Sequence, residues 1–506
     1  MKNSIFRRST SWILLLATLV CAALPLLTSC TDTTPATGTQ TQTGEPTTEE
    51  AGTTAGETEE ENTHVRPTID FTIPDDKNLV KMLETVPLAN ANMTEAELRD
   101  VVLKFMKVQL TFAYTPDFGD NYDESSYTYY IKNLKSLYGG QEGTRITFEE
   151  GKAYGGVPYK GNTCGTIYRW LPFYEEETGF MDWEPIINSQ RLNWKNADNG
   201  EIWPNVGSSV FGNSCSSACF WAWGRVTNQL KGPWCASWLP SNGYVQVGDY
   251  QLGADNKRAE GNDAILAANG RQKMYQAYAQ VKAADGFVSD GHATMAISDA
   301  HVVYNANGTI NGTESYVLIA EQKASFLTAS PAKGGVDLYS PMNSEGATYR
   351  IMGNWPGTIV NEKVKEMKWN FVYLFDTGYL PFTIPEFSGA DPVEKAEASM
   401  SHPSETIKFH TIKAKTITSN YCISDVTINV KNKDGKIVYS GFYCPTGVPS
   451  KTVSLEGALL NNVIYKNKGA INLALSGYTD GNYTLEVQCR VSTGELFTVY
   501  TGTITE

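Results

Sequence analysis

The sequence predicts an α+β fold in which a mixed region of helices and strands precedes an all-β region. Residues 67–388 contain apolar runs of both helical and strand spacing, together with many aromatic side chains. Residues 406–506 contain short runs in which apolar and polar residues alternate, which is the pattern of half-buried strands. Residues 389–405 between them are polar and rich in Ala, Glu and Ser, so we expect a linker there.

The N-terminus has the features of an export signal. Lys2, Arg7 and Arg8 precede a short apolar run that ends in Leu27-Thr28-Ser29-Cys30. Residues 1–29 resemble a bacterial lipoprotein signal peptide, with Cys30 as the lipidated first residue of the mature chain, and an ordinary secretory signal is the alternative. The apolar run of about sixteen residues is shorter than the roughly twenty that span a membrane. We therefore expect an extracytoplasmic protein that is anchored to the cell membrane by lipid.

The segment after the signal predicts a disordered tether. Residues 30–66 are rich in Thr, Glu and Gly and contain no aromatic residue, so they cannot bury enough apolar surface to fold. Eight acids and one base give residues 31–66 a net charge of −7, which is half of the −14 of the whole chain. The remainder is only mildly acidic. Nucleic acids bind to basic surfaces, so we do not expect a nucleic-acid partner. We also expect the protein to be a monomer.

The C-terminal residues 406–506 predict an antiparallel sandwich of the immunoglobulin type. Turn signals occur at Asp434-Gly435, Asp480-Gly481 and Gly494. The residues that alternate on either side of these turns are Val426, Ile428, Val430, Tyr483, Leu485, Val487, Cys489, Phe497 and Val499. No group of potentially catalytic side chains is visible here, so we expect a spacer or a binding module.

The region 67–388 begins with a clear helix signal. Thr94 and Glu97 have the spacing of a capping box. The apolar residues that follow on one helical face are Leu98, Val101, Val102 and Phe105. Further along the chain, residues 271–281 have the spacing of a helix and residues 315–322 that of a strand.

Cys215 lies at the predicted start of a helix within residues 212–230. Asn213 and Ser214 supply the N-terminal cap, and Gly232-Pro233 supply a stop signal. A thiol in this position feels the positive end of the helix dipole, which lowers its pKa and increases the fraction of reactive thiolate. The alternative is an inert buried cysteine, because cysteine is among the most buried residue types.

A thiol nucleophile needs an imidazole that takes its proton and later gives it to the leaving group. Gly291-His292 begins an apolar strand, and only His292 and His301 lie in the mixed region after Cys215. The two histidines are nine positions apart, so in an unbroken strand their side chains point to opposite faces. We favour His292 as the base and expect His301 to be a surface residue.

The order of these motifs resembles that of the NlpC-type branch of the papain-like superfamily, which are bacterial cell-wall cysteine peptidases. The matching elements are Pro158-Tyr159, Cys215-Ser216-Ser217-Ala218, Ala284-Asp285, Gly291-His292, and either Glu321 or Gln322. The resemblance covers about residues 150–325. It implies a helix carrying the nucleophile Cys215 packed on an antiparallel sheet, and cleavage of amide or isopeptide bonds in peptidoglycan stem peptides.

The chain departs from the family pattern in three places. Asn213-Ser214 stands where the family has Asp directly before the nucleophile, and Ala284 stands where it has Gly. The segment from Asn162 to Gly212 is a long insertion between the turn and the nucleophile. These differences bear on the substrate subtype more than on the nucleophile.

Two further roles remain to be filled. Glu321 and Gln322 are neighbours on one predicted strand, so only one of them can face His292 and orient its ring. A carboxylate holds the imidazolium better, while an amide matches the papain-like pattern, and the sequence leaves this choice open. The backbone N–H of Cys215 and the side chain of Tyr159 are candidates to bind the oxyanion; a packed turn aromatic is the alternative for Tyr159.

Two other interpretations are kept. Cys219, followed by Phe220-Trp221, is similar to the nucleophile of CHAP amidases, but it lies one turn inside the helix, where the dipole field has faded. Alternatively, the papain-like domain is catalytically inactive and the lipoprotein binds cell wall or glycan. The sequence has no His-Glu-x-x-His motif, no Cys-x-x-Cys motif and no phosphate-binding loop, so we expect neither a metal nor a cofactor.

Overall fold

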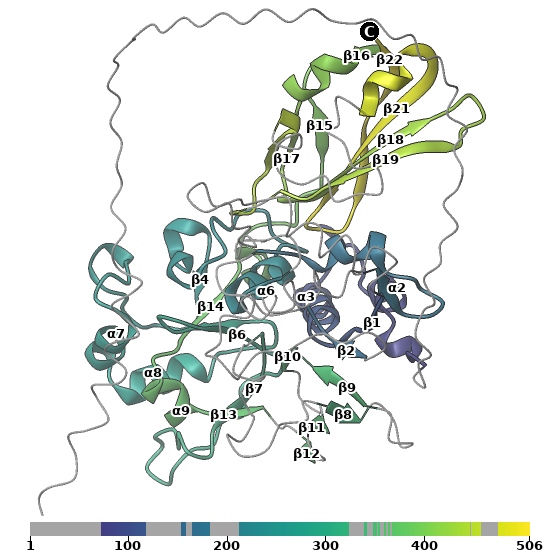
Figure 1. Ribbon diagram of the computed structural model, residues 1–506. Coiled ribbons are helices and arrows are strands. Elements are labelled where there is room, and N and C mark those ends of the chain that lie inside the picture. The colour runs from purple at the N-terminus through teal and green to yellow at the C-terminus, as the bar shows by residue number, and fades with distance from the viewer. Residues whose placement is uncertain are drawn as a thin grey trace, which may run out of the picture. The chain divides into compact units, whose positions relative to one another are not determined.

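The computed structural model contains helices and several sheets, and its C-terminal region is mostly β, as the sequence predicted (Figure 1). The residues that it describes are 72–117, 153–157, 164–182, 212–322, 339–341, 348–351, 353–354, 359–360, 363–364, 367–445, 447–456 and 474–506. The expected signal peptide with Cys30, the expected tether and Tyr159 lie outside these ranges. None of the described helices has the length and apolar character that crossing a membrane requires.

The described helices are short, apart from α3. The α-helices are α2 (Leu79–Glu84), α3 (Glu95–Thr111), α6 (Cys215–Trp223), α7 (Asn262–Asn269), α8 (Arg271–Tyr278) and α9 (Phe371–Asp376). The 3₁₀ segments are η1 (Asp75–Lys77), η2 (Ile167–Phe173), η3 (Cys235–Ser237), η4 (Pro240–Asn242), η5 (Ala254–Asn256), η7 (Pro385–Ser388), η8 (Phe409–Ala414) and η9 (Ser476–Tyr478).

The sheet beside α6 has the strand order β10-β7-β6-β5-β14-β4, and β13 also pairs with β7. Its neighbouring strands all run antiparallel. Its strands are β4 (Val245–Gln246), β5 (Gly286–Val288), β6 (Ala293–Ala296), β7 (Tyr316–Gln322), β10 (Gly353–Asn354), β13 (Lys368–Asn370) and β14 (Leu380–Thr383). Strands β6 and β7 are adjacent, which places the end of β7 beside the start of β6.

The remaining strands of the first region form two smaller sheets. One has the order β3-β1-β2-β9-β8, and the other pairs β11 with β12. Their bounds are β1 (Ala113–Asp117), β2 (Tyr154–Gly155), β3 (Phe180–Asp182), β8 (Tyr339–Pro341), β9 (Thr348–Ile351), β11 (Ile359–Val360) and β12 (Lys363–Val364).

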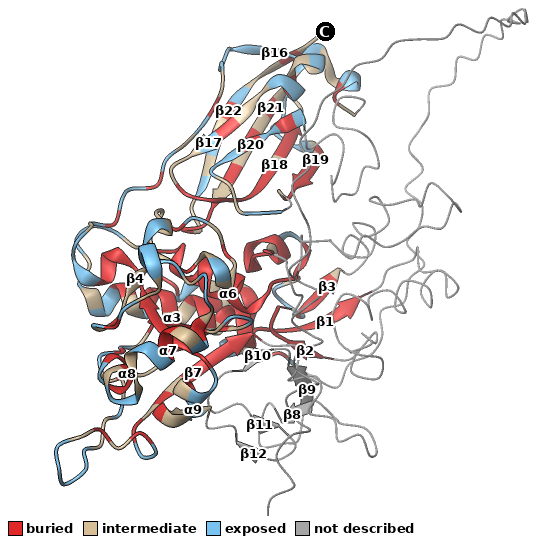
Figure 2. Ribbon diagram, turned by 90° about the vertical axis from the view of Figure 1, so that its left-hand side faces the viewer, coloured by how far each residue is buried: buried red, intermediate tan, exposed pale blue. Residues whose placement is uncertain are grey.

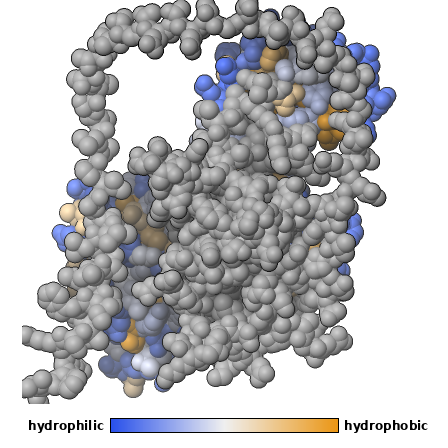
Figure 3. All heavy atoms as spheres, viewed as in Figure 1, coloured by the Kyte–Doolittle hydropathy of each residue, from blue (hydrophilic) through white to orange (hydrophobic). Residues whose placement is uncertain are grey.

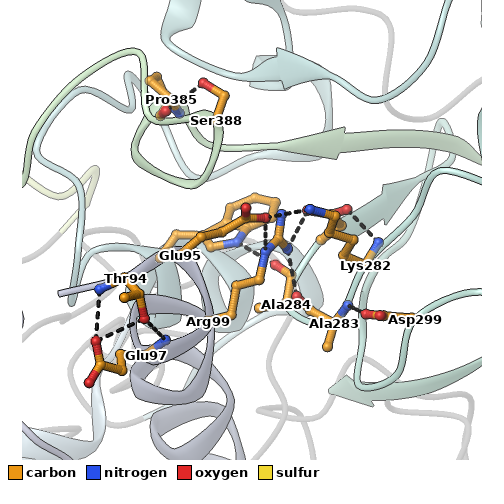
Figure 4. Close-up of polar contacts among 12 residues, drawn as sticks. Thr94, Glu95, Glu97, Arg99, Lys282, Ala283, Ala284, Asp299, Pro385 and Ser388 are labelled. Carbon is orange, nitrogen blue, oxygen red and sulfur yellow. Dashed lines mark hydrogen bonds and ion pairs between the residues drawn. The ribbon is translucent and has the colours of Figure 1, made fainter.

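Helix α3 begins where the capping box predicted. The Thr94 backbone N–H donates to Glu97 Oε2 at 2.8 Å, and the Glu97 N–H donates to Thr94 Oγ1 at 3.4 Å (Figure 4). These bonds satisfy donors that the first helical turn otherwise leaves without partners. The predicted apolar face is buried throughout, at Leu98, Val101, Val102 and Phe105.

An arginine of α3 fixes this helix to the loop that enters β5. Arg99 bonds Glu95 at 2.9 Å and donates to the carbonyl of Ala283 at 2.6 Å, and Lys282 reaches the same Glu95 carboxylate at 2.9 Å (Figure 4). Arg99 also pairs with the buried carboxylate of Asp285 at 2.8 Å. These contacts join α3 to the sheet that carries β6.

Helix α6 is buried on all sides (Figure 2). It packs against α3 and β6. Gln109 of α3 donates to the carbonyl of Ala218 at 3.1 Å, which joins the two helices. The helix ends at Trp223, well before the predicted stop at Gly232-Pro233. Ser492 Oγ donates to the carbonyl of Gly224 at 2.7 Å, so a residue far along the chain satisfies this helix end.

The C-terminal region contains two sheets whose side chains share one buried cluster. The first sheet consists of β15 (Ala398–Met400), β17 (Thr416–Ser419) and β20 (Thr452–Ser454). The second has the order β16 (Thr406–Lys408), β22 (Leu496–Thr505), β21 (Asp480–Val491), β18 (Ile423–Lys431) and β19 (Ile437–Tyr443). Strand β15 thus lies within residues 389–405, where we expected a linker, because the apolar side chain of Met400 is buried in this cluster.

The predicted alternation holds for most of these strands. Leu485, Val487 and Cys489 are fully buried, whereas Phe497 and Val499 are only half-buried. The pairing of β21 with β22 has a register shift between Val487 and Gln488, and Val499 is the extra residue within it. On the face shown in Figure 3, the described surface of this region is mainly hydrophilic, with small hydrophobic patches.

Candidate active site

The N-terminus of α6 places Cys215 at the centre of the candidate site. Ser214 caps the helix, because its side chain accepts from the Ser217 N–H at 3.4 Å while the Ser217 hydroxyl accepts from the Ser214 N–H at 2.8 Å. Cys215 is the first helical residue and is 4% exposed. Its sulfur therefore lies in the positive field of the helix start, in a region that excludes most water.

His292 is held by a tight turn immediately before β6. The Ser289 N–H donates to the carbonyl of His292 at 2.8 Å, and the His292 N–H donates to Ser289 Oγ at 3.1 Å. The sequence placed the start of the strand at Gly291-His292, and the observed strand starts one residue after His292. The pairing of β5 with β6 brings this turn beside the N-terminus of α6, which packs against β6.

The two candidate orienting residues on β7 point in different directions. Glu321 Oε2 lies 2.8 Å from His292 Nε2, and its side chain is 4% exposed. Gln322 instead donates a hydrogen bond to the carbonyl of Val157. This difference follows from the alternation of side chains along a strand. The structure therefore brings Glu321, and not Gln322, to the imidazole, which leaves Nδ1 as the ring nitrogen for Cys215.

The environment favours a charged pair. Hydrogen bonding from Cys235 lowers the pKa of the Cys215 thiol, burial raises it, and the charge and hydrogen bond of His292 lower it further, so that it lies well below the usual range. Burial lowers the pKa of His292, but Cys215 and Glu321 together raise it to about 9. At neutral pH the pair is therefore a thiolate and an imidazolium, the form in which a cysteine is nucleophilic.

The competing thiol, Cys219, lies one turn further along α6 and is fully buried in the core. Burial, with the nearby charge of Cys215, raises the pKa of the Cys219 thiol well above its usual range. His301 is exposed, and its ring packs against Tyr316 at a centroid distance of 4.8 Å. Neither residue is placed for catalysis.

The backbone adds a donor that sequence patterns do not indicate. The N–H of Ala293, the first residue of β6, hydrogen-bonds to Cys215 and lowers the pKa of its thiol. The backbone N–H of Cys215 itself lies at the open end of α6, where an oxyanion would find it. Tyr159, which we expected as the second oxyanion donor, lies outside the described residues.

Sequence reasoning missed three residues around the pair. Cys235 contacts Cys215, Tyr379 bonds Ser289 and lies near Glu321, and Arg258 bonds the backbone on both sides of the site. Burial raises the pKa of Tyr379, which keeps its phenol neutral. None of the three belongs to a recognisable motif, because chain folding alone brings them to Cys215.

Among the described residues, no three His, Cys, Asp or Glu side chains gather in a way that could hold a metal ion. No protein-family model matches the chain, and a search of curated proteins finds no significant relative.

The charged pair predicts selective alkylation. At neutral pH, iodoacetamide should modify Cys215 and leave Cys219 unmodified, because only Cys215 is held as a thiolate. His292→Ala should slow modification of Cys215 by about tenfold or more, because loss of the imidazolium should raise the pKa of Cys215 above neutral pH, where each further unit removes about nine-tenths of the remaining thiolate. Mass spectrometry of the peptide carrying both cysteines measures the two sites, and His301→Ala is the matched control. Equal modification of the two cysteines in the native protein would contradict the assignment.

Proposed function

We propose that the chain is a cysteine hydrolase that cleaves amide or isopeptide bonds in peptidoglycan stem peptides. The contact series from Cys215 through His292 to Glu321 supports this proposal most strongly, since these are the parts that thiol catalysis requires. The substrate class comes from the resemblance of the motifs to NlpC-type peptidases. We further propose a papain-like arrangement for the α6 helix and its sheet, and an immunoglobulin-like arrangement for the C-terminal region.

The mechanism assigns one step to each group. The Cys215 thiolate attacks the carbonyl carbon of the scissile bond, and the negative charge moves to the carbonyl oxygen, near the Cys215 N–H. The His292 imidazolium gives its proton to the leaving amine as the carbon–nitrogen bond breaks, which leaves a thioester on Cys215. His292, now neutral, takes a proton from water, which hydrolyses the thioester and regenerates the pair. Glu321 holds the ring orientation and stabilises the imidazolium in both halves of the reaction.

The proposed location fits this substrate. A signal peptide ending before Cys30 would deliver the protein to the outer face of the membrane, with a lipid at Cys30 and residues 30–66 as a tether. A flexible tether lets the catalytic region reach polymer near the membrane surface. The C-terminal β-region would then act as a spacer or as a binding module for the wall.

One observation favours a second candidate function. Cys215 is only 4% exposed, as expected for a domain that has lost catalysis and serves as a binding module for wall or glycan. The two functions differ in whether any wall preparation yields a product.

Digestion of purified peptidoglycan tests the proposed function. The wild-type protein should release new peptide termini, Cys215→Ala should release none, and Cys219→Ala should retain activity, because Cys219 only fills the core. Separation of the muropeptides by chromatography and mass spectrometry identifies the bond. No product from any wall preparation would exclude this reaction, and activity that survives in Cys215→Ala but is lost in Cys219→Ala would assign the nucleophile to Cys219.

The pH profile tests Glu321. Activity requires an imidazolium, so it should decline as the pH rises through the pKa of His292, at about 9. Glu321→Gln keeps the side-chain shape but removes the charge that helps to raise this pKa, so the alkaline limb should move to lower pH. The rate of hydrolysis measured against pH reports this limb, with Glu314→Gln, an exposed glutamate before β7, as the control. An unchanged limb in Glu321→Gln would remove Glu321 from the site.

A further inference from the structure

A second thiol lies at the proposed nucleophile. Cys235 is the first residue of η3, and its thiol lies within interaction range of the Cys215 thiol and of Ser216. Trp238, directly after η3, packs on Trp223 at a centroid distance of 4.8 Å, and Trp223 is the last residue of α6. The η3 segment is therefore fixed along α6, with its thiol at the end of the helix where Cys215 lies.

Arg258 joins this segment to the turn that holds His292. Its Nη1 donates to the carbonyl of Cys235 at 2.7 Å, and its Nη2 donates to the carbonyl of Ser289 at 3.2 Å. Ser289 in turn accepts from the His292 N–H. One guanidinium thus binds the backbone of Cys235 and the backbone of Ser289, the residue that holds His292.

The position of Arg258 is itself determined by buried contacts. Its side chain is 6% exposed, and its Nε donates to Asn262 Oδ1 at 2.7 Å. Asn262 is buried and donates to the carbonyls of Val288 and Gly378 at 2.8 and 2.7 Å. Asp290 lies 3.5 Å from the guanidinium and supplies a partner for its charge. The five donors of a guanidinium suit this role, which a lysine could fill only in part.

We propose that Cys235 is a further catalytic residue, whose S–H donates to the Cys215 thiolate, and that Arg258 is the positioning residue that holds Cys235 and His292 on either side of it. This inference rests on the proposed function, because it assigns a role around the same nucleophile. Cys235 keeps its proton throughout, since its own pKa is raised by the hydrogen bond to Cys215 and by burial. It acts as a donor and not as a second nucleophile.

The contact has a calculable benefit. A donor that lowers the pKa of Cys215 by one unit increases the thiolate fraction about tenfold while the thiol is mostly protonated. The same unit lowers the nucleophilicity of the thiolate only about threefold. The net gain applies at pH values below the midpoint, so the thiol contact extends the range of pH over which Cys215 is reactive.

Other groups around Cys215 also affect its ionisation. His292, backed by Glu321, approaches from the sheet, Cys219 lies below on α6, and Tyr379 approaches from the segment before β14. Burial raises the pKa of Cys219 and of Tyr379, so both stay neutral. His292 is present in every variant below, so a change in the midpoint in the Cys235 variants reports on Cys235.

The test is the rate at which iodoacetamide modifies Cys215 in the full-length protein as a function of pH, measured by mass spectrometry without substrate. Cys235→Ala should raise the midpoint of this profile by about one pH unit, which is about a tenfold slower reaction below the midpoint. Cys235→Ser should restore part of the shift, because a hydroxyl still donates. Arg258→Lys should also raise the midpoint, since it loses contacts to the two backbone carbonyls.

Matched controls separate these effects from general damage. Cys489→Ala removes a buried thiol of β21, and Arg490→Lys removes a partly buried guanidinium of the same strand that also bonds a carbonyl and lies 3.8 Å from a carboxylate. Both should leave the midpoint unchanged. An unchanged midpoint in Cys235→Ala and in Cys235→Ser would overturn the proposal, and Cys235→Ser, which keeps the side-chain size, guards against misfolding. If no wall substrate is cleaved but the midpoint depends on Cys235, the proposed function fails and the thiol contact stands.

Discussion

The cost of keeping an ionised sulfur and an ionised imidazole away from water governs this region of the molecule. Burying a charge is expensive unless hydrogen bonds and an opposite charge replace the lost water. The Cys215 sulfur lies at the start of α6, beside the Ala293 N–H, the Cys235 thiol and His292. The His292 imidazole lies beside Glu321. These groups come from α6, from residues 292–293 at the start of β6, from η3 and from β7, so the fold must bring four segments together within a short distance.

The surrounding packing provides this rigidity. Helix α6 has no solvent-facing side, so its position is set by α3 and by the sheet beneath it. Helix α3 is in turn fixed to the loop before β5 by Arg99, and β5, β6 and β7 are joined in register. A shift of one residue between β6 and β7 would exchange Glu321 for Gln322 at His292. The chemistry of the site therefore depends on strand register as much as on residue identity.

Much of this could be predicted from the sequence, because the signals are local. The capping box of α3 and the helix start at Cys215 follow from residues within one helical turn. The preference for His292 over His301 follows from the glycine before His292 and the apolar strand after it. The choice between Glu321 and Gln322 could not be predicted, because it depends on how β7 pairs with β6. The end of α6 at Trp223 was missed because Ser492, far along the chain, satisfies Gly224.

The roles of Cys235 and Arg258 could be predicted from the sequence even less than the choice between Glu321 and Gln322. No spacing relates them to Cys215 or His292, and only the packing of Trp238 on Trp223 and the buried contacts of Asn262 bring them there.

The central claim is that Cys215 and His292 form an ion pair. Nuclear magnetic resonance titration of the His292 imidazole measures it directly, with a midpoint near pH 9 expected in the wild-type protein and a clearly lower midpoint in Cys215→Ala. A midpoint at the ordinary value of about 6.5 in both proteins would contradict the account.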